Sequence, residues 1–429
     1  MVDRGLPTDP WNTVRRLMPL LSLFSVIAVL FGTVGLSSAG ARASHRAIAA
    51  SRTHRITHGK AKHAKKLHKP AHRRRPVRRA APVRSFAPAR PAMIATGAGA
   101  PLRFGVYPWA GVGTVNQADP AVADDPAEAL AAVEALKGGR SLTMHIYGQY
   151  TGVDPHEADA LVSDATWWSA NGLRVEMVLR YRPARPDLDA GYVPWVQSVA
   201  TRLAALPGLL ALQIGNEPNN TQSAAAGDGA YPGVVSAIAH GIPAARGALV
   251  AAGRPDVKVG FNWAAGSSPC TTEPIWSQLR AAGGQALTAA VGWVGIDVYP
   301  GTWSAPSQST TPTASLINAT VTDSLRCVRT RHMVAAGLSS AVTITVAETG
   351  YPTDPARSEA TQAAVLKDTI ASVESVRRTY GVTDLRWFCL RDANTASGQL
   401  ENGYGLLRDD YSAKPAFSAY QQIIAAEGA

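Results

Sequence analysis

Two glutamates, Glu217 and Glu348, each close a run of apolar residues in this 429-residue chain. The first stands in Gly215-Asn216-Glu217-Pro218 and the second in Ala347-Glu348-Thr349-Gly350. A carboxylate at the end of an apolar run is costly to bury unless it has partners or a chemical task. Two such carboxylates that face one bond can act as a general acid/base and a nucleophile. If they lie apart, they serve only as salt-bridge partners, so the elements that carry them decide between these alternatives.

Eight short runs of apolar, β-branched and aromatic residues recur from Pro101 onward, separated by Ala- and Leu-rich stretches. Their first residues are 33 to 51 positions apart, which leaves room for a crossover helix and two loops each time. We therefore expect eight parallel strands joined by helices. The runs cover residues 103–109, 141–150, 174–181, 209–217, 257–263, 291–299, 342–348 and 384–390.

Parallel strands joined by right-handed crossovers close naturally into a (β/α)₈ TIM barrel, which is the fold that we predict for residues 101–429. An open doubly wound sheet is the alternative, but Gly111-Val112-Gly113 lacks the remaining glycine of a phosphate-binding loop. Active sites of barrels lie where the strands end, and Glu217 and Glu348 close the fourth and seventh runs. They should therefore face each other. Composition favours helices over, for example, Pro126–Leu136, Pro194–Ala205 and Ala360–Tyr380.

The sequences around the two glutamates resemble those of a known superfamily. Asn216-Glu217-Pro218 is similar to the acid/base signature, and Glu348-Thr349-Gly350-Tyr351-Pro352 to the nucleophile signature, of glycoside hydrolases with catalytic glutamates on strands four and seven. The nucleophile segment resembles that of β-1,3-glucanases, which commonly reads E-T-G-W-P. The acid/base segment resembles the β-xylosidase, α-L-iduronidase-like and cellulase families. The ending Asn402-Gly403-Tyr404-Gly405-Leu406-Leu407 also fits, so the resemblance covers roughly residues 101–425.

This resemblance implies a retaining double displacement. Glu348 would attack the anomeric carbon, while Glu217 would first protonate the leaving oxygen and then activate water. Both tasks require a raised pKa of Glu217, which we expect from apolar surroundings and from the charge of Glu348. The two carboxyl groups of such a pair lie about 5 to 5.5 Å apart.

The same resemblance assigns roles to residues around the sugar. Asn216 would hydrogen-bond the 2-hydroxyl group, and Tyr299 would hydrogen-bond the nucleophile. Trp387 would form the floor of the subsite that holds the reacting sugar. Members of the superfamily commonly have a cis peptide after this tryptophan, so we expect one at Trp387-Phe388. Each aromatic residue could instead serve in ordinary packing.

Further candidates come from their places in the expected strands. His145 and Tyr147 lie in the second run and Arg180 in the third, where they would bind hydroxyl groups or orient Glu348. Tryptophan stacks well on the apolar face of a sugar ring. Tryptophans at or just after strand ends are Trp109, Trp263 and Trp303.

Residues 1–43 have the pattern of an export signal. Arg15-Arg16 precedes an uncharged apolar run over residues 17–36, and Ala41-Arg42-Ala43 fits a cleavage site. The run is also long enough to span a bilayer, so a retained anchor is the alternative. The protein is thus predicted to be secreted or associated with the cell envelope, and anchored in the membrane if residues 17–36 are retained.

Residues 44–100 are predicted to be a basic, disordered linker. Positions 44–91 hold fifteen Lys and Arg, six His and no acidic residue, within a chain of net charge +11. Residues 92–429 then carry about −6, so the high pI belongs to the linker and not to the barrel. Few large apolar residues are present to offset the chain entropy. The linker would bind an anionic lipid surface or envelope polymer, or act as a spacer. Nucleic acid is not expected because no aromatic residues interleave the charges.

The three cysteines do not have the spacing of a metal site. Cys389 lies within a strand pattern and is expected to be a buried thiol, which leaves Cys270 and Cys327 as a candidate disulfide in an oxidising compartment. We expect neither a metal nor an organic cofactor, because two carboxyl groups suffice for glycoside hydrolysis. The protein is expected to be a monomer.

Three hypotheses for the function remain. The first is an exported retaining glycosidase that cleaves β-glycosidic bonds of an oligo- or polysaccharide. The second is a catalytically weak, carbohydrate-binding barrel tethered to the cell envelope. The third is a membrane-tethered scaffold, for which a retained anchor is the only support. The sugar, the linkage and endo or exo action depend on loops whose shape one sequence does not define.

Overall fold

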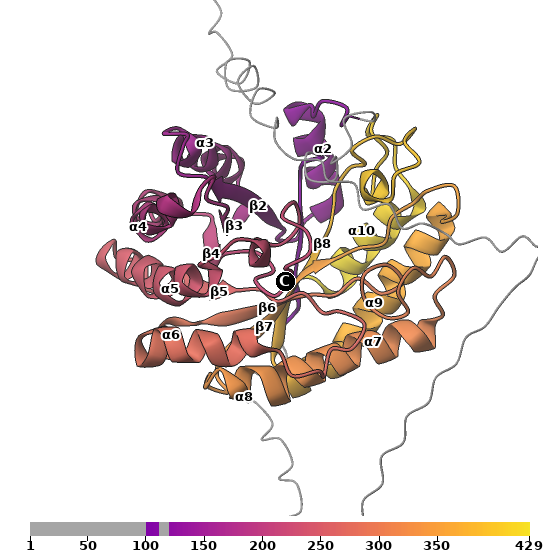
Figure 1. Ribbon diagram of the computed structural model, residues 1–429. Coiled ribbons are helices and arrows are strands. Elements are labelled where there is room, and N and C mark those ends of the chain that lie inside the picture. Colours follow the sequence, from indigo (N-terminus) through magenta and orange to yellow (C-terminus); the bar gives the residue numbers. More distant parts are fainter. Residues whose placement is uncertain (1–99, 111–119) are drawn as a thin grey trace, which may run out of the picture. The chain divides into compact units, whose positions relative to one another are not determined.

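The computed structural model describes residues 100–110 and 120–429, so the predicted signal and all but the last residue of the predicted linker lie outside the described residues. Eight parallel strands pair in chain order and β8 pairs with β1, which closes the barrel. Helices surround the strands (Figure 1). The strands are β1 (Arg103–Val106), β2 (Thr143–Tyr150), β3 (Arg174–Tyr181), β4 (Leu209–Ile214), β5 (Lys258–Phe261), β6 (Trp293–Asp297), β7 (Thr343–Thr349) and β8 (Val382–Trp387).

The TIM-barrel prediction is confirmed, as is the existence of all eight strands. Local signals define several of the surrounding helices. Asp125 caps the N-terminus of α2 and Ser358 that of α9, each by accepting a backbone N–H. The helices are α2 (Pro126–Lys137), α3 (Glu157–Ala170), α4 (Tyr192–Leu203), α5 (Val234–Ala251), α6 (Pro274–Ala290), α7 (Ala314–Cys327), α8 (Met333–Ala335), α9 (Glu359–Tyr380) and α10 (Pro415–Glu427).

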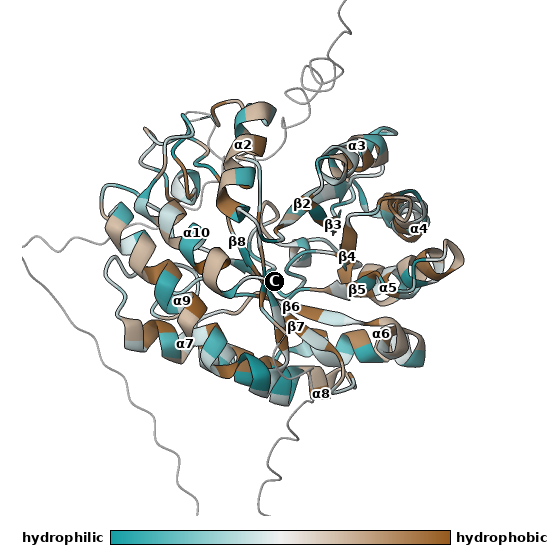
Figure 2. Cartoon of the chain, turned by 180° about the vertical axis from the view of Figure 1, so that it is seen from behind, coloured by the Kyte–Doolittle hydropathy of each residue, from teal (hydrophilic) through white to brown (hydrophobic). Residues whose placement is uncertain are grey.

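The main hydrophobic core lies between the strands and the surrounding helices. Several helices show hydrophobic and hydrophilic residues on different sides (Figure 2), as expected when one side packs on a sheet and the other meets water. Helix α5 is apolar and long enough to cross a membrane, but half of it is buried in this layer of the barrel. Its apolar character is therefore explained by packing.

The interior of the barrel carries charged side chains. Successive residues of a strand point to opposite sides, so every second residue faces the barrel axis. From β8, Arg386 reaches Asp384 at 2.8 Å and, across the barrel, Glu176 of β3 at 3.0 Å. Gly105 of β1 makes room for this arginine, because a Cβ atom there would lie 2.4 Å from Cδ of Arg386.

The C-terminal helix closes the ring at β1. Helix α10 packs against α2 and α9, and Tyr420 donates a hydrogen bond to the carbonyl of Gly105 at 2.9 Å. The amide of Ala429 bonds to the carbonyl of Leu102. These contacts tie the end of the chain to the first strand, so residues up to the C-terminus are part of the barrel.

A disulfide joins Cys270, in the loop before α6, to Cys327 at the end of α7, and Cys389 is a buried free thiol. Both cysteine predictions are confirmed. Disulfides persist in oxidising compartments.

Candidate active site

Three carboxyl groups meet at the carboxyl ends of the strands. Glu217 follows β4, Glu348 lies near the end of β7, and Asp297 is the last residue of β6. One carboxylate oxygen from each residue lies within 4.8 Å of the other two. Glu348 and Asp297 are buried, whereas Glu217 is partly exposed. The two glutamates that the sequence analysis selected are therefore brought together, with a third acid beside them.

The chain turns sharply after β4 to present Glu217. Gly215 has a φ of 75° and Glu217 a φ of 44°, a left-handed conformation that is unfavourable for a residue with a side chain. A Cβ atom on Gly215 would lie 2.9 Å from Ile238. The backbone of Glu217 is held by Asn262 of the neighbouring strand end, whose Oδ1 accepts the Glu217 N–H at 2.7 Å. Backbone strain at a reactive residue is typical of functional sites.

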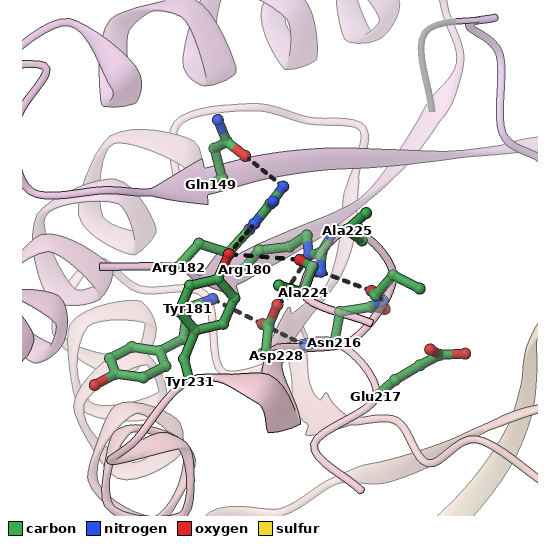
Figure 3. A network of polar contacts seen from close by, with 12 residues as sticks. Gln149, Arg180, Tyr181, Arg182, Asn216, Glu217, Ala224, Ala225, Asp228 and Tyr231 are labelled. Carbon is green, nitrogen blue, oxygen red and sulfur yellow. Dashed lines mark hydrogen bonds and ion pairs between the residues drawn. The ribbon is translucent and has the colours of Figure 1, made fainter. Parts of the chain in front are cut away.

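The buried ion pair between Arg180 and Asp228 holds the backbone of this turn (Figure 3). Arg180 of β3 donates to Asp228 at 2.9 Å and to the carbonyls of Ala225 and Ala226. Asp228 in turn accepts the backbone N–H of Asn216 at 2.8 Å. The carboxylate of Glu217 points away from this network in Figure 3. Arg180, which we expected to bind hydroxyl groups or orient Glu348, instead fixes the loop that carries Glu217.

Two phenols hold the carboxylate of Glu348. Tyr147 of β2 donates to Oε1, and Tyr299, just after β6, donates to Oε2 at 2.8 Å. Burial, followed by the nearby Glu348 charge, raises the pKa of both tyrosines well above its usual value. They therefore keep their protons and act as donors to the two oxygens of Glu348. The placement of Tyr299 agrees with the role that the resemblance implied.

Glu217 has the opposite electrostatic setting. Burial and then the charge of Glu348 raise its pKa to about 7, against a smaller opposing effect of the hydrogen bond from Asn220. These are the two causes expected from the sequence. A carboxyl group that titrates near neutral pH can give a proton and take it back, as a general acid/base must.

Asp297 was missed by the sequence analysis, although an acidic residue at the end of an apolar strand is the same signal that selected the glutamates. Burial, Glu348 and Glu217 together raise its pKa well above the usual value, in that order of effect. Asn262 Nδ2 donates to its Oδ2. Three acids this close would also suit a cation, but burial and the charge of Glu348 raise the pKa of Glu217 and Asp297, and Glu348 already accepts two phenols. The arrangement favours proton transfer over metal binding.

The other predicted site residues lie on different sides of their strands, some facing the barrel interior and some the surrounding helices. Asn216 is buried at the site, where its side chain bonds Asn262 and the carbonyl of Ala226. His145 faces the interior and reaches Tyr147 through Nε2 at 2.9 Å. Trp263 points outward to Glu273, to which its indole donates at 2.7 Å. It offers no surface to a sugar at the strand ends, because it is fully buried.

Trp387 is likewise fully buried in the core outside the barrel, since Arg386 beside it faces the interior. The next residue, Phe388, faces the site: it is partly exposed, stacks on Tyr107 at 5.3 Å between ring centroids, and contacts Tyr299 edge-on at 6.5 Å. Phe388 thus occupies the position that we expected for the tryptophan.

The prediction of a cis bond at Trp387-Phe388 is wrong, because the cis bond lies at Phe388-Cys389. The Trp387 carbonyl accepts from Tyr107, while the Phe388 amide donates to Thr349 on the opposite side. A trans peptide directs its C=O and N–H groups to opposite sides, so bonds to both neighbouring strands keep this unit trans.

An aromatic group extends from Phe388 along the strand ends. Tyr404 contacts both Phe388 and Tyr299 at 5.8 Å. Burial raises the pKa of Tyr404, and interactions with Thr302 and Trp303 oppose this effect. Trp303 itself is 48% exposed, which is unusual for such a large apolar side chain. Of the three further tryptophans considered from the sequence, Trp303 is exposed, Trp109 is partly exposed and packs against Trp167 and Trp168, and Trp263 is buried.

Neither a family model nor a curated protein matches this sequence. Among solved structures, a GH5_18 protein from Streptomyces cattleya in complex with Manβ1-4GlcNAc is similar with a TM-score of 0.53 and 17% identity, over 76% of this chain and 80% of that one. The GH5_18 protein from Bifidobacterium longum subsp. longum, in complex with the same sugar, gives 0.52 and 12%, over 76% and 78%. A family 39 glycoside hydrolase from Bacteroides cellulosilyticus gives 0.50 and 17%, over 76% and 64%.

At these identities the likeness establishes the fold. The chain is a (β/α)₈ barrel of the architecture found in these glycoside hydrolases. It carries a pair of glutamates, in contrasting environments, at the ends of β4 and β7.

Proposed function

We propose that this protein is an exported retaining glycoside hydrolase that cleaves β-glycosidic bonds by double displacement. The observation that carries the proposal is the pair Glu217 and Glu348, with carboxylate oxygens within 4.8 Å of each other, of which Glu217 has a raised pKa and Glu348 accepts two phenols. Inverting enzymes keep their carboxyl groups about 6.5 to 9.5 Å apart to admit a water molecule. The short separation here supports direct attack by one carboxylate.

In the first step, an oxygen of Glu348 forms a bond to the anomeric carbon while the bond to the leaving oxygen breaks. Glu217 gives its proton to that oxygen, and its raised pKa keeps the proton available near neutral pH. The product is a glycosyl ester of Glu348 and an anionic Glu217. Tyr147 and Tyr299 orient the attacking carboxylate from both oxygens.

In the second step, Glu217 takes a proton from water as the water oxygen attacks the anomeric carbon. The ester bond breaks and Glu348 leaves as a carboxylate, which restores the resting enzyme. The two phenols stabilise the negative charge that returns to Glu348 during this step. The site therefore contributes to both halves of the reaction with the same groups.

The substrate class follows from the surface around the pair. Phe388, which is partly exposed, and Trp303, which is exposed, offer flat apolar faces of the kind on which sugar rings stack, while the buried Tyr404 packs behind Phe388. Two of the similar structures hold a β-linked disaccharide, which supports a β-glycosidic substrate here. Asn216 lies beside Glu217, but its buried side chain already bonds Asn262 and the carbonyl of Ala226, so its proposed contact with the sugar 2-hydroxyl group rests on the resemblance.

Export is supported by two features. The sequence of residues 1–43 has the pattern of a signal, and the Cys270–Cys327 disulfide is stable where the compartment is oxidising. We propose that the enzyme acts outside the cytoplasm on envelope or extracellular carbohydrate, with the basic linker as its attachment to anionic surfaces.

The test is hydrolysis by the purified protein of a panel of aryl β-glycosides and β-linked polysaccharides. Glu348→Ala is the control, because it removes the nucleophile. Turnover that this variant loses supports the proposal. Binding of a carbohydrate with no turnover by either protein would instead support a carbohydrate-binding barrel, and neither binding nor turnover would favour a scaffold.

A further inference from the structure

A continuous chain of polar contacts crosses the barrel interior and ends on Glu348. It begins at Arg386, which bonds Oε2 of Glu176 at 3.0 Å. The other oxygen of Glu176 lies 2.8 Å from Nδ1 of His145. Nε2 of His145 lies 2.9 Å from the hydroxyl of Tyr147, which donates to Glu348. His145, Glu176 and Arg386 are at most 2% exposed, so this is a built interior feature and not a surface contact.

The donors and acceptors along this chain of contacts define what each ring nitrogen of His145 must do. Tyr147 has one proton and gives it to Glu348, so the tyrosine oxygen must accept from Nε2 of His145. The carboxylate of Glu176 can only accept, so Nδ1 must donate as well. Burial acts to raise the pKa of Glu176, but Arg386 and His145 outweigh it and leave that pKa lowered. With Glu176 ionised and Tyr147 donating to Glu348, both ring nitrogens of His145 act as donors in this arrangement.

The charges around His145 agree with this arrangement. Arg386 and the partly exposed Arg103 are paired with Asp384 and Glu176, two cations against two anions. Glu348 adds one anion, and its charge, after burial, raises the pKa of both Glu217 and Asp297, which opposes further negative charge there. A buried region with an unbalanced charge is strongly disfavoured. A cationic His145 balances Glu348.

We propose that His145 is a positioning residue, an imidazolium that acts on the nucleophile through the hydroxyl of Tyr147. The inference rests on the proposed role of Glu348. The cation strengthens the Tyr147 hydrogen bond, keeps Glu348 ionised at lower pH and stabilises it as the leaving group in the second step. The structure assigns this effect to the Tyr147 side of the carboxylate, because Tyr299 makes no contact with His145 among the described interactions.

Several titratable groups surround the two ends of this chain and must be considered in any pH dependence. Around Glu348 they are Tyr147 of β2, Asp297 of β6, Tyr299 after β6 and Glu217 after β4. Around His145 they are Tyr147, Glu176 of β3 and, beyond Glu176, Arg386 and Asp384 of β8. Arg180 of β3 is a further charge that acts on Tyr147.

The first test is a double-mutant cycle read from the acid limb of the kcat/KM profile, which reports ionisation of the nucleophile. His145→Gln should move this limb up by about one pH unit, a tenfold change in ionised Glu348 at fixed acidic pH. The shift should nearly vanish when His145→Gln is made in a Tyr147→Phe background. It should persist in the matched Tyr299→Phe background. Equal shifts in both backgrounds, or a loss of activity at all pH values with no shift, would overturn the proposal.

The second test uses no variant, and it does not require the protein to be active. In the full-length protein labelled with ¹⁵N-histidine, the nitrogen chemical shifts of His145 at neutral pH should be those of two protonated ring nitrogens, assigned through contacts with Tyr147. One unprotonated nitrogen would overturn the proposal whatever the activity of the protein. Two protonated nitrogens in a protein that hydrolyses no glycoside would support the imidazolium and reject the proposed function instead.

Discussion

At the level of single residues, three acids share one small region but have different surroundings. Glu348 accepts hydrogen bonds from two phenols, whereas the partly exposed Glu217 and the buried Asp297 have a pKa that is raised by desolvation and then by the Glu348 charge. Burial without compensation favours the neutral form of an acid, and a nearby anion adds to this. The three side chains are all carboxylic acids, so their different hydrogen bonds and pKa shifts result from the residues around them.

The raised pKa of Glu217 predicts the basic limb of activity. The first step needs a protonated Glu217, so kcat/KM should fall as the pH rises through about 7. Glu348→Gln removes the second cause of this shift and should lower the pKa of Glu217. Titration of ¹³C-labelled glutamate side chains by NMR would measure it in the inactive variant. An unchanged pKa would show that the Glu348 charge does not act on Glu217.

Ionisation of Asp297 should lower the free energy of unfolding as the pH rises. Its pKa in the folded protein lies above the unfolded value of about 3.9, so folding stability declines with rising pH between these two values. Asp297→Asn has no such loss, and its stability relative to the unchanged protein should grow from pH 4 to pH 7. Urea unfolding at both pH values would measure the difference.

The same variant should keep its activity within about tenfold, because an amide resembles the neutral acid in shape and can still accept from Asn262. A loss of activity of more than about 100-fold at neutral pH would mean that the reaction needs an ionised Asp297. A stability difference that does not depend on pH would contradict the raised pKa.

At the level of elements, the ends of β3 and β4 and the loop around Asp228 form the support of the acid/base residue. Asp228 accepts from Arg180 and from the backbone of Tyr181 and Asn216, which holds the turn before Glu217. No signal in the sequence marked this residue, because it begins the short 3-10 helix Asp228–Ala230 and no apolar strand precedes it. Its role depends on the contacts that folding creates.

Asp228→Asn should therefore lower kcat by about 100-fold with a smaller effect on KM, since misplacing a catalytic group by about 1 Å costs on this order. It should also destabilise the fold by about 3 to 5 kcal/mol, because it leaves Arg180 buried without its anion. Asp159→Asn is a matched control, since it removes an exposed ion pair with Arg202 and should cost at most about 1 kcal/mol. Equal effects of the two variants on kcat would argue against a positioning role for Asp228.

The strands also show how much of the fold and of the site could be predicted from the sequence. The period of apolar runs predicted all eight strands, and β3 has the bounds expected. Trp263 and Trp387 were predicted as site residues from their residue type alone. Both point outward, because the residues before them, Asn262 and Arg386, face the interior of the barrel. Alternation along the strand was available from the sequence and would have favoured Asn262 and Phe388.

Alternation alone would have failed at the nucleophile. The pairing of β7 with β8 is irregular between Val346 and Thr349, and Ala347 packs inside the barrel with Trp293 and Ala211. A strictly alternating β7 would turn Glu348 outward; the irregularity turns it to the site. One sequence does not reveal such an irregularity, so the resemblance of the surrounding motif was the better guide to Glu348.

At the level of the whole molecule, the predicted basic linker and the barrel differ sharply in charge. The fifteen cationic residues of positions 44–91 are followed by a mildly acidic barrel that holds the site and closes on its own C-terminus. Attachment and catalysis are thus expected to be separable. Lipid headgroups and anionic envelope polymers are the surfaces that such a charge would bind.

A chain that begins at Ala100 should fold and keep its activity on small soluble glycosides. Its sedimentation with anionic vesicles should fall, and for the full-length protein this binding should weaken as salt rises, because screening shortens electrostatic interactions. If the shorter chain stays folded but loses activity, the linker belongs to the active site. If vesicle binding is unchanged, the barrel itself carries the binding surface.

The central claim is that Glu348 forms a covalent bond to the sugar, and the configuration of the first product tests it most directly. A β-glycoside that the protein hydrolyses would be followed by ¹H NMR, with the anomeric signals recorded before mutarotation. Double displacement predicts that the β anomer appears first and the α anomer only as the sugar equilibrates. An α anomer as the first product would contradict the account, because a single displacement by water needs no bond to Glu348.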